Sequence, residues 1–197
     1  MPQERPLRAD AARNRAKIME AANRQIIARG PEVPMEAIAA DAGVAVGTLY
    51  RHFPTKDDLV RAVLDECLAD MTQEAVAAAD RVEAGARALD EFIAFARFVM
   101  ESAAGNKAVK AAARSLGTEY DESGHMQEGH GAMVRIIEAG KAEGDLRPDL
   151  VPEDGYLFFA TVPIDVPLQV RERWFTLMID GFRSGAAQDA PVRSKAP

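Results

Sequence analysis

The sequence predicts an all-α protein, and three observations support this fold class. Apolar residues recur at spacings of three and four through most of the 197-residue chain, which is the period of an amphipathic helix. No stretch shows the strict apolar–polar alternation that indicates a half-buried strand. Gly and Pro stand between the periodic stretches, where helices end. With 48% hydrophobic and 28% charged residues, the composition is that of a globular protein with one or two domains.

The N-terminal part is expected to be a short arm followed by one helix. Residues 1–8 contain two prolines and two arginines, and we expect them to be disordered. An amphipathic helix is predicted over residues 9–29, ended by Gly30-Pro31. Its apolar residues lie on or near one face, namely Ala12, Ala16, Met19, Ala22, Ile26 and Ile27.

Residues 34–53 predict two short helices joined by a tight turn. The first runs from Pro34 to about Ala42, with Met35, Ile38, Ala39 and Ala42 inward, and Gly43 follows as a residue that ends helices. A second helix of about seven residues turns Leu49 and Phe53 inward. It leaves free Gly47, Thr48, Tyr50, Arg51 and His52. This is the pattern of a helix-turn-helix, whose second helix can enter a DNA major groove.

The rest of the chain also shows helical periodicity. Thr55 is a favourable N-cap, and Asp57 and Asp58 suit the positive end of a helix dipole, so a helix should run from there to about residue 79. Further helices are predicted over residues 83–103, 106–116, 118–142, 152–166 and 168–185. Residues 186–197 are polar, and we expect a disordered tail there.

The helix-turn-helix segment resembles the DNA-binding head of the tetracycline-repressor (TetR) family of transcription regulators. The matching residues are Ile38-Ala39, Ala42-Gly43-Val44, Gly47-Thr48-Leu49-Tyr50, His52-Phe53, Lys56 and Leu59. The resemblance implies a DNA-binding domain over residues 9–55 and a helical ligand-binding and dimerisation domain over residues 56–185. It further implies a homodimer that binds a pseudo-palindromic operator in double-stranded DNA and that a small-molecule effector releases. We therefore expect a transcriptional repressor, with no enzymatic activity and no cofactor.

The resemblance also assigns DNA contacts to individual residues. Thr48 and Tyr50 would contact the DNA backbone and groove, and His52 and Lys56 would hold phosphates. Arg51 could read guanine O6 and N7 in the major groove. The alternative is an ordinary helical hairpin. We consider it weaker because a purely structural solvent face would more often carry Glu and Lys.

Four further features belong to this surface. Val46 is expected to touch a thymine methyl group, and Gly47 permits a close approach of the backbone. Pro34 stands where the family usually has Thr or Ser; proline fits the first helical turn, but it gives no side-chain contact to phosphate. Four arginines near the N-terminus could form a minor-groove arm or simply be solvated, namely Arg5, Arg8, Arg13 and Arg15.

The body is rich in aromatic and methionine side chains, which suit an apolar ligand cavity as well as a core. The expected pocket residues are Phe92, Phe95, Met100, Met126, His130, Met133, Phe158 and Trp174. The last two helices carry apolar residues on two faces, so one face should meet a partner. Phe175, Met178 and Phe182 lie three and four apart, and we assign them to the dimer interface.

Charge, cysteine content and hydropathy bound the remaining possibilities. Residues 1–61 contain ten Lys/Arg and eight Asp/Glu, a net charge of +2, although the whole chain carries −7. A mildly basic head on an acidic body is consistent with DNA binding. A single cysteine, Cys67, excludes an internal disulfide framework, and no run of apolar residues reaches membrane-spanning length. We expect a cytoplasmic protein that does not associate with a membrane.

Two rival interpretations remain open at this point. One is a DNA-binding regulator without small-molecule control. The other is a small helical enzyme or metal-binding protein, because Glu122 and His125 have the Glu-x-x-His spacing of di-iron bundles. That motif occurs once, whereas such a bundle needs it twice, and no nucleophile or phosphate-binding motif accompanies it. We therefore expect no metal and no catalytic residue.

Overall fold

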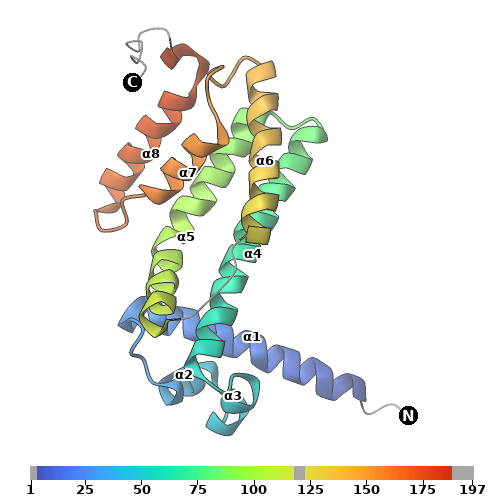
Figure 1. Cartoon of the computed structure of the whole chain (residues 1–197), viewed down its shortest axis with the longest axis vertical. Coiled ribbons are helices and arrows are strands. Elements are labelled where there is room, and N and C mark those ends of the chain that lie inside the picture. Colours follow the sequence, from blue (N-terminus) through green and yellow to red (C-terminus); the bar gives the residue numbers. More distant parts are fainter. Residues whose placement is uncertain (1–3, 118–122, 188–197) are drawn as a thin grey trace. The chain divides into compact units, whose positions relative to one another are not determined.

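A computed structural model describes residues 4–117 and 123–187, and every named element in those ranges is a helix (Figure 1). The all-α prediction is confirmed. The elements are α1 (Glu4–Arg29), α2 (Met35–Ala42), α3 (Val46–His52), α4 (Lys56–Glu83), α5 (Ala88–Leu116), α6 (Ser123–Ala142), α7 (Pro152–Ala160), α8 (Leu168–Phe182) and a 3-10 turn η1 (Ser184–Ala187). None of the described helices combines the length and the apolar character needed to cross a bilayer.

The chain forms two compact units. Among the described residues, the head unit comprises 4–70 and 104–117, and the body unit comprises 71–103 and 123–187. The first half of α4 belongs to the head unit because it contributes core residues there, including Leu59, Val63 and Leu64. The C-terminal part of α5 does the same through Val109, Ala112 and Ala113.

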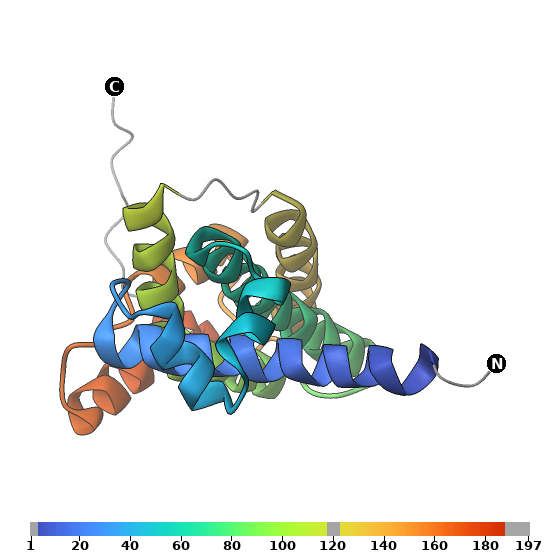
Figure 2. The same cartoon turned by 90° about the horizontal axis from the view of Figure 1, so that it is seen from below.

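The head unit packs α1, α2 and α3 around one apolar core. Figures 1 and 2 show α2 and α3 lying against α1. Large buried side chains of this core include Ile18, Met19 and Ile26 of α1, Ile38 of α2, Leu49 of α3, Phe53 directly after α3, and Leu59 of α4. The lone Cys67 is half-buried against the same core. Burial, followed by the charges of Asp70 and Glu66, raises the pKa of its thiol to about 11.

The body unit is built around Phe158 of α7, which is 1% exposed. Its ring stacks on Trp174 of α8 with the centroids 4.8 Å apart. Phe175 and Phe182, also from α8, meet it edge-on at 6.0 and 6.2 Å. The Phe92 ring of α5 contacts Phe182 at 5.6 Å. Aromatic pairs in this geometry add stability beyond the area they bury, so this cluster fixes α7 and α8 against α5.

Several predicted helix boundaries are wrong. Helix α1 begins at Glu4, so residues 4–8 are helical rather than a disordered arm, and α5 is continuous where two helices were expected. Gly105 is compatible with this continuity because it packs tightly on α1: a Cβ there would lie 3.1 Å from Ile27 Cδ1. Helix α7 ends at Ala160, and η1 includes residues 186 and 187 of the expected tail. The remaining tail and residues 118–122 lie outside the described residues.

Candidate DNA-binding surface

The turn between α2 and α3 forms as the sequence predicts. Helix α2 starts after Pro34, whose carbonyl accepts from the Ala37 and Ile38 amides at 3.1 and 3.2 Å, without any side-chain cap. It ends at Gly43, whose φ of 65° lies in the left-handed region that favours glycine. The Val44 amide then bonds to the Ala39 carbonyl at 3.0 Å. These bonds turn the chain sharply enough for α3 to begin at Val46.

Two apolar side chains anchor α3 and so determine which face is exposed. Leu49 is fully buried, and Phe53, directly after the helix, is 3% exposed. Their predicted inward orientation is confirmed. Other side chains of α3 turn outward: Val46 and Tyr50 are 40% and 41% exposed. Of the other predicted DNA contacts, Gly47 and Arg51 are exposed and Thr48, His52 and Lys56 are half-buried.

Tyr50 and Arg51 of α3 each donate a hydrogen bond to another side chain of the head unit. The Tyr50 hydroxyl donates to Glu36 Oε1 of α2 at 3.3 Å. Burial, and then the charge and hydrogen bond of Glu36, raise the pKa of Tyr50, so its phenol stays protonated and able to donate at neutral pH. Arg51 Nη2 donates to Thr48 Oγ1 at 3.1 Å, one turn earlier in the same helix.

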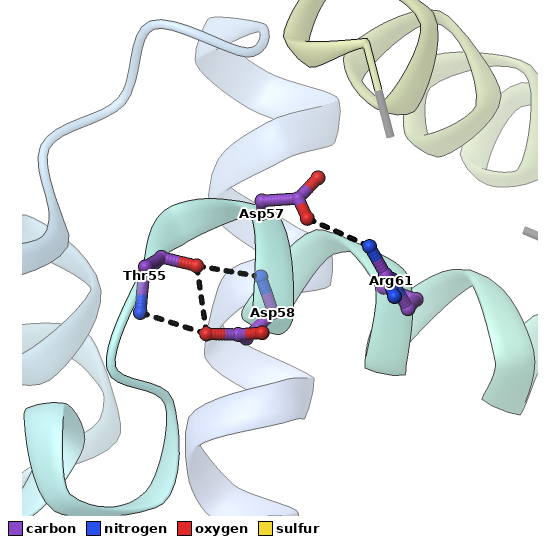
Figure 3. Close-up of polar contacts among 4 residues, drawn as sticks. All are labelled: Thr55, Asp57, Asp58 and Arg61. Carbon is purple, nitrogen blue, oxygen red and sulfur yellow. Dashed lines mark hydrogen bonds and ion pairs between the residues drawn. The ribbon is translucent and has the colours of Figure 1, made fainter. Parts of the chain in front are cut away.

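The start of α4 is held by a reciprocal cap, which Figure 3 shows. Thr55 Oγ1 accepts from the Asp58 amide at 3.1 Å, and Asp58 Oδ2 accepts from the Thr55 amide at 3.0 Å. The predicted N-cap role of Thr55 is confirmed. Asp57 forms an ion pair with Arg61 at 2.9 Å on the same helix. Lys56 is the first residue of α4, so this cap fixes its backbone position.

The predicted arginine arm is not a single feature. Arg15 places its guanidinium carbon 5.3 Å from the centroid of the Phe53 ring, a cation–π contact between α1 and the residue after α3. Arg13 pairs with Asp10 on α1. Arg15 therefore braces the head core, and both residues are part of α1. The side chains of Arg5 and Arg8 lie outside the described residues.

Most of the predicted pocket residues lie together in the body core. Phe92, Phe95, Met100, Met133 and Phe158 are buried there, and Trp174 is half-buried against the same cluster. Met126 differs, because its side chain is 52% exposed on α6 and is not enclosed by the body core. His130 is half-buried, and its ring stacks parallel to Tyr156 of α7 at a centroid distance of 6.2 Å.

The assignment of Phe175 and Phe182 to a dimer surface is corrected by their burial. They are 4% and 8% exposed and pack against Phe158 inside their own protomer. Met178 is half-buried against the same core. Helical spacing alone could not show which of the two apolar faces of α8 points inward. The large apolar side chains exposed on α7 and α8 are instead Tyr156, Leu157, Leu168, Val170 and Leu177.

Within the described ranges, no three His, Cys, Asp or Glu side chains come together as a metal-ligand set.

Sequence reasoning missed the contact of Glu36 with Tyr50 and that of Arg15 with Phe53. Both pairs join different parts of the head unit, and no local spacing signals such a contact.

Comparison with known proteins relates this geometry to one family. The family model "Bacterial regulatory proteins, tetR family" matches residues 18–63, the segment that contains α2 and α3. An HTH-type transcriptional regulator of Staphylococcus aureus (strain USA300) is 41% identical over 63 residues, which are 32% of this chain and 34% of the relative. The match therefore spans about a third of the length of that curated relative.

Solved structures extend the likeness beyond the head unit. A TetR transcription regulatory protein from Mycobacterium vanbaalenii is 32% identical with a TM-score of 0.72, and the match covers 90% of this chain and 99% of that one. A TetR transcriptional regulator from Streptomyces coelicolor is 27% identical with a TM-score of 0.70, covering 86% and 98%. The match to the Mycobacterium vanbaalenii regulator, at 32% identity, extends along almost the whole of that protein and of this one, and the tetR family model covers the helix-turn-helix. The chain therefore belongs to the TetR family of bacterial transcription regulators.

Proposed function

We propose that this protein is a homodimeric repressor that binds a pseudo-palindromic operator and releases it when a small apolar or aromatic molecule binds. The observation that carries the proposal is the division of α3 into two faces. Leu49 and Phe53 fix the helix to the head core, and the opposite face presents hydrogen-bonding side chains to solvent. A helix held in this way can enter the major groove without disturbing the core.

The proposed contacts divide between bases and phosphates. Arg51 reads guanine through its guanidinium group, and the exposed Val46 lies against a thymine methyl group. Gly47 adds no side chain, so the backbone of α3 can come close to the DNA. Thr48 and Tyr50 contact the groove and the sugar-phosphate backbone. These contacts determine both the register of the helix and the sequence that it prefers.

His52 and Lys56 hold phosphates at the end of α3 and the start of α4. Such contacts supply affinity that depends on salt but not on sequence. The charge distribution supports this assignment, because residues 1–61 carry a net +2 within a chain of −7. The acidic remainder of the chain disfavours non-specific contact with DNA. A transcription regulator of this family would work in the cytoplasm. The proposal includes no catalytic step.

The dimer contact is proposed on the outward faces of α7 and α8. Leu157 and Leu168 are 60% and 61% exposed, and Val170 and Leu177 are 52% and 53% exposed. Large apolar side chains in such number on two consecutive helices favour burial against a partner. A second copy with the same faces would complete a four-helix contact and place two α3 helices on successive major grooves, ~34 Å apart.

Effector control is proposed for the aromatic core of the body unit. The Phe158–Trp174 stack and its neighbours could separate to admit a flat apolar molecule, because aromatic and methionine side chains adapt to such ligands. Phe92, Phe95, Met100, Met133 and His130 are the other candidate contacts. To cause release, the effector must bind more tightly to the conformation whose heads do not match the operator.

The experiment is a DNA-binding assay with the DNA upstream of the protein's own gene. Fluorescence anisotropy and DNase footprinting should show a protected, pseudo-palindromic site, with a stoichiometry of at least one dimer per site. An Arg51→Ala variant should bind less tightly and discriminate less between bases at one position of each half-site. A compound library scored for release of the DNA tests effector control. A protein that protects no upstream site, or whose affinity and base preference are unchanged in Arg51→Ala, contradicts the proposed DNA contacts.

A further inference from the structure

Glu36 and Tyr50 contact each other across the two helices of the helix-turn-helix. The Tyr50 hydroxyl donates to Glu36 Oε1 at 3.3 Å. Glu36 lies in the first turn of α2, and Tyr50 lies near the end of α3. Both residues are exposed, so the contact lies on the surface of the head unit that is proposed to face DNA.

The chemistry of this contact conflicts with phosphate binding by Tyr50. A phenol has one proton to donate, whereas a phosphate oxygen and an ionised carboxylate can only accept. Tyr50 therefore cannot give a full hydrogen bond to Glu36 and to a DNA phosphate at the same time. Binding DNA through this hydroxyl requires the contact with Glu36 to break.

Breaking the contact leaves a carboxylate close to the DNA backbone. Like charges repel, and the repulsion grows when water is displaced from between them. The DNA-free protein is thus favoured twice, by the Tyr50–Glu36 hydrogen bond and by the solvation of the Glu36 carboxylate. Both effects reduce operator affinity relative to a head that has a neutral acceptor at position 36.

We propose that Glu36 competes with DNA phosphate for the Tyr50 hydroxyl and thereby limits the affinity of the head for its operator. The inference rests on the proposed DNA-binding function. Glu36 acts through Tyr50 and not by contacting a base, so it is a positioning residue. A regulator of this kind keeps its affinity below the maximum that its contacts allow, which makes release by an effector easier.

The test is a double-mutant cycle on operator binding. Glu36→Gln keeps an oxygen that accepts from Tyr50 but removes the charge, and it should tighten binding about two- to fivefold, the range typical of an exposed charge interaction. Tyr50→Phe should weaken binding. In the double variant, the increase in affinity from Glu36→Gln should be clearly smaller, because the competition for the Tyr50 hydroxyl is gone and only the repulsion between the carboxylate and DNA is relieved. An increase of the same size in the Tyr50→Phe background overturns the proposal, because Glu36 would then act by general repulsion alone.

A matched control and the base sequence of the operator distinguish competition for Tyr50 from two different roles of Glu36. Glu32→Gln removes the same charge from another exposed position of the head unit and should leave affinity unchanged. An equal increase in affinity from Glu32→Gln would overturn the proposal. The proposal would also be overturned if Glu36→Gln lowered affinity only for operators with one particular base pair at one position. Glu36 would then read sequence directly, because a carboxylate can accept from cytosine N4. Melting temperatures check that removing an acidic residue from the first turn of α2 has not unfolded the head.

A second measurement needs no DNA. Burial is the first cause of the raised pKa of Tyr50, and the charge and hydrogen bond of Glu36 are the others. Glu36→Gln should therefore lower the pKa of Tyr50 in the free protein. Ultraviolet absorbance measures this titration, and the Tyr50→Phe variant shows which part of the signal comes from Tyr50. An unchanged titration overturns the inference. A wild-type protein that binds no DNA overturns the proposed function as well, whereas DNA binding without coupling overturns the inference alone.

Discussion

Thr55 and Asp58 cap each other at the start of α4. Besides the two backbone bonds, the Thr55 hydroxyl donates to Asp58 Oδ2 at 2.7 Å, so each side chain satisfies the amide of the other residue. This is a capping box with Asp in the place of Glu. Lys56 lies between the two residues, so the cap also fixes the backbone position of the proposed phosphate contact. The sequence predicted this cap from Thr55.

Thr55→Ala should lower the free energy of unfolding by about 1 kcal/mol, because the first turn of α4 loses its side-chain cap. Urea denaturation of the whole chain measures this change. Thr55→Ser retains the hydroxyl group and should recover most of the stability. If the Ser and Ala variants are equally unstable, the methyl group of Thr55 matters and the cap does not.

Lys56→Ala should weaken operator binding and make it less sensitive to salt. For duplex DNA, the slope of log K against log salt becomes shallower by about 0.9 for each phosphate that the protein no longer neutralises. Affinities measured by anisotropy from low to moderate salt give this slope. Lys141→Ala, in the body unit, is the control and should leave it unchanged. A wild-type slope in Lys56→Ala would exclude Lys56 from phosphate binding.

Phe53→Ala should destabilise the head and abolish DNA binding together. Phe53 is 3% exposed, and truncating a buried Phe to Ala costs roughly 3–5 kcal/mol. The variant also removes the ring on which the Arg15 guanidinium rests. Thermal melting and anisotropy measure the two effects, and Phe53→Leu should reduce both to a smaller extent. A Phe53→Ala protein that melts like wild type but does not bind DNA would show that the residue is not a core anchor.

Leu177→Arg should convert the dimer to a monomer and greatly reduce operator affinity. Leu177 is 53% exposed in the protomer, so the substitution should be tolerated there but would place an unpaired charge in the proposed interface. Sedimentation velocity measures the change, and Thr176→Arg, at the neighbouring exposed position, is the control. Leu177→Arg that remains a dimer would move the interface away from this face of α8.

The local signals in the sequence predicted the parts of the fold that depend on local bonding. The Gly43 turn, the Thr55 cap and the inward Leu49 and Phe53 all follow from preferences within a few residues. The exposed face of α3 was predictable for the same reason, because two anchors fix the orientation of a seven-residue helix.

Predictions failed where the outcome depends on what a helix packs against. Spacing placed Phe175 and Phe182 on one face of α8, but it could not distinguish the protomer's own core from a partner. Two helices were expected over residues 83–103 and 106–116, but α5 is continuous, and the lack of a side chain at Gly105 allows the close packing of Ile27. The Glu36–Tyr50 pair joins residues on two helices, and neither residue signals the other in the sequence.

The protonation of the Cys67 thiol determines how fast this side chain reacts with oxidants. Thiolates react with peroxides and alkylating reagents, whereas thiols are nearly inert. With a pKa of about 11 and a half-buried side chain, Cys67 is almost entirely protonated at neutral pH. Cys67 should therefore react slowly with mild oxidants. Because Cys67 is the sole cysteine in the sequence, a thiol reagent would label this one position, slowly at neutral pH and faster as the pH approaches about 11.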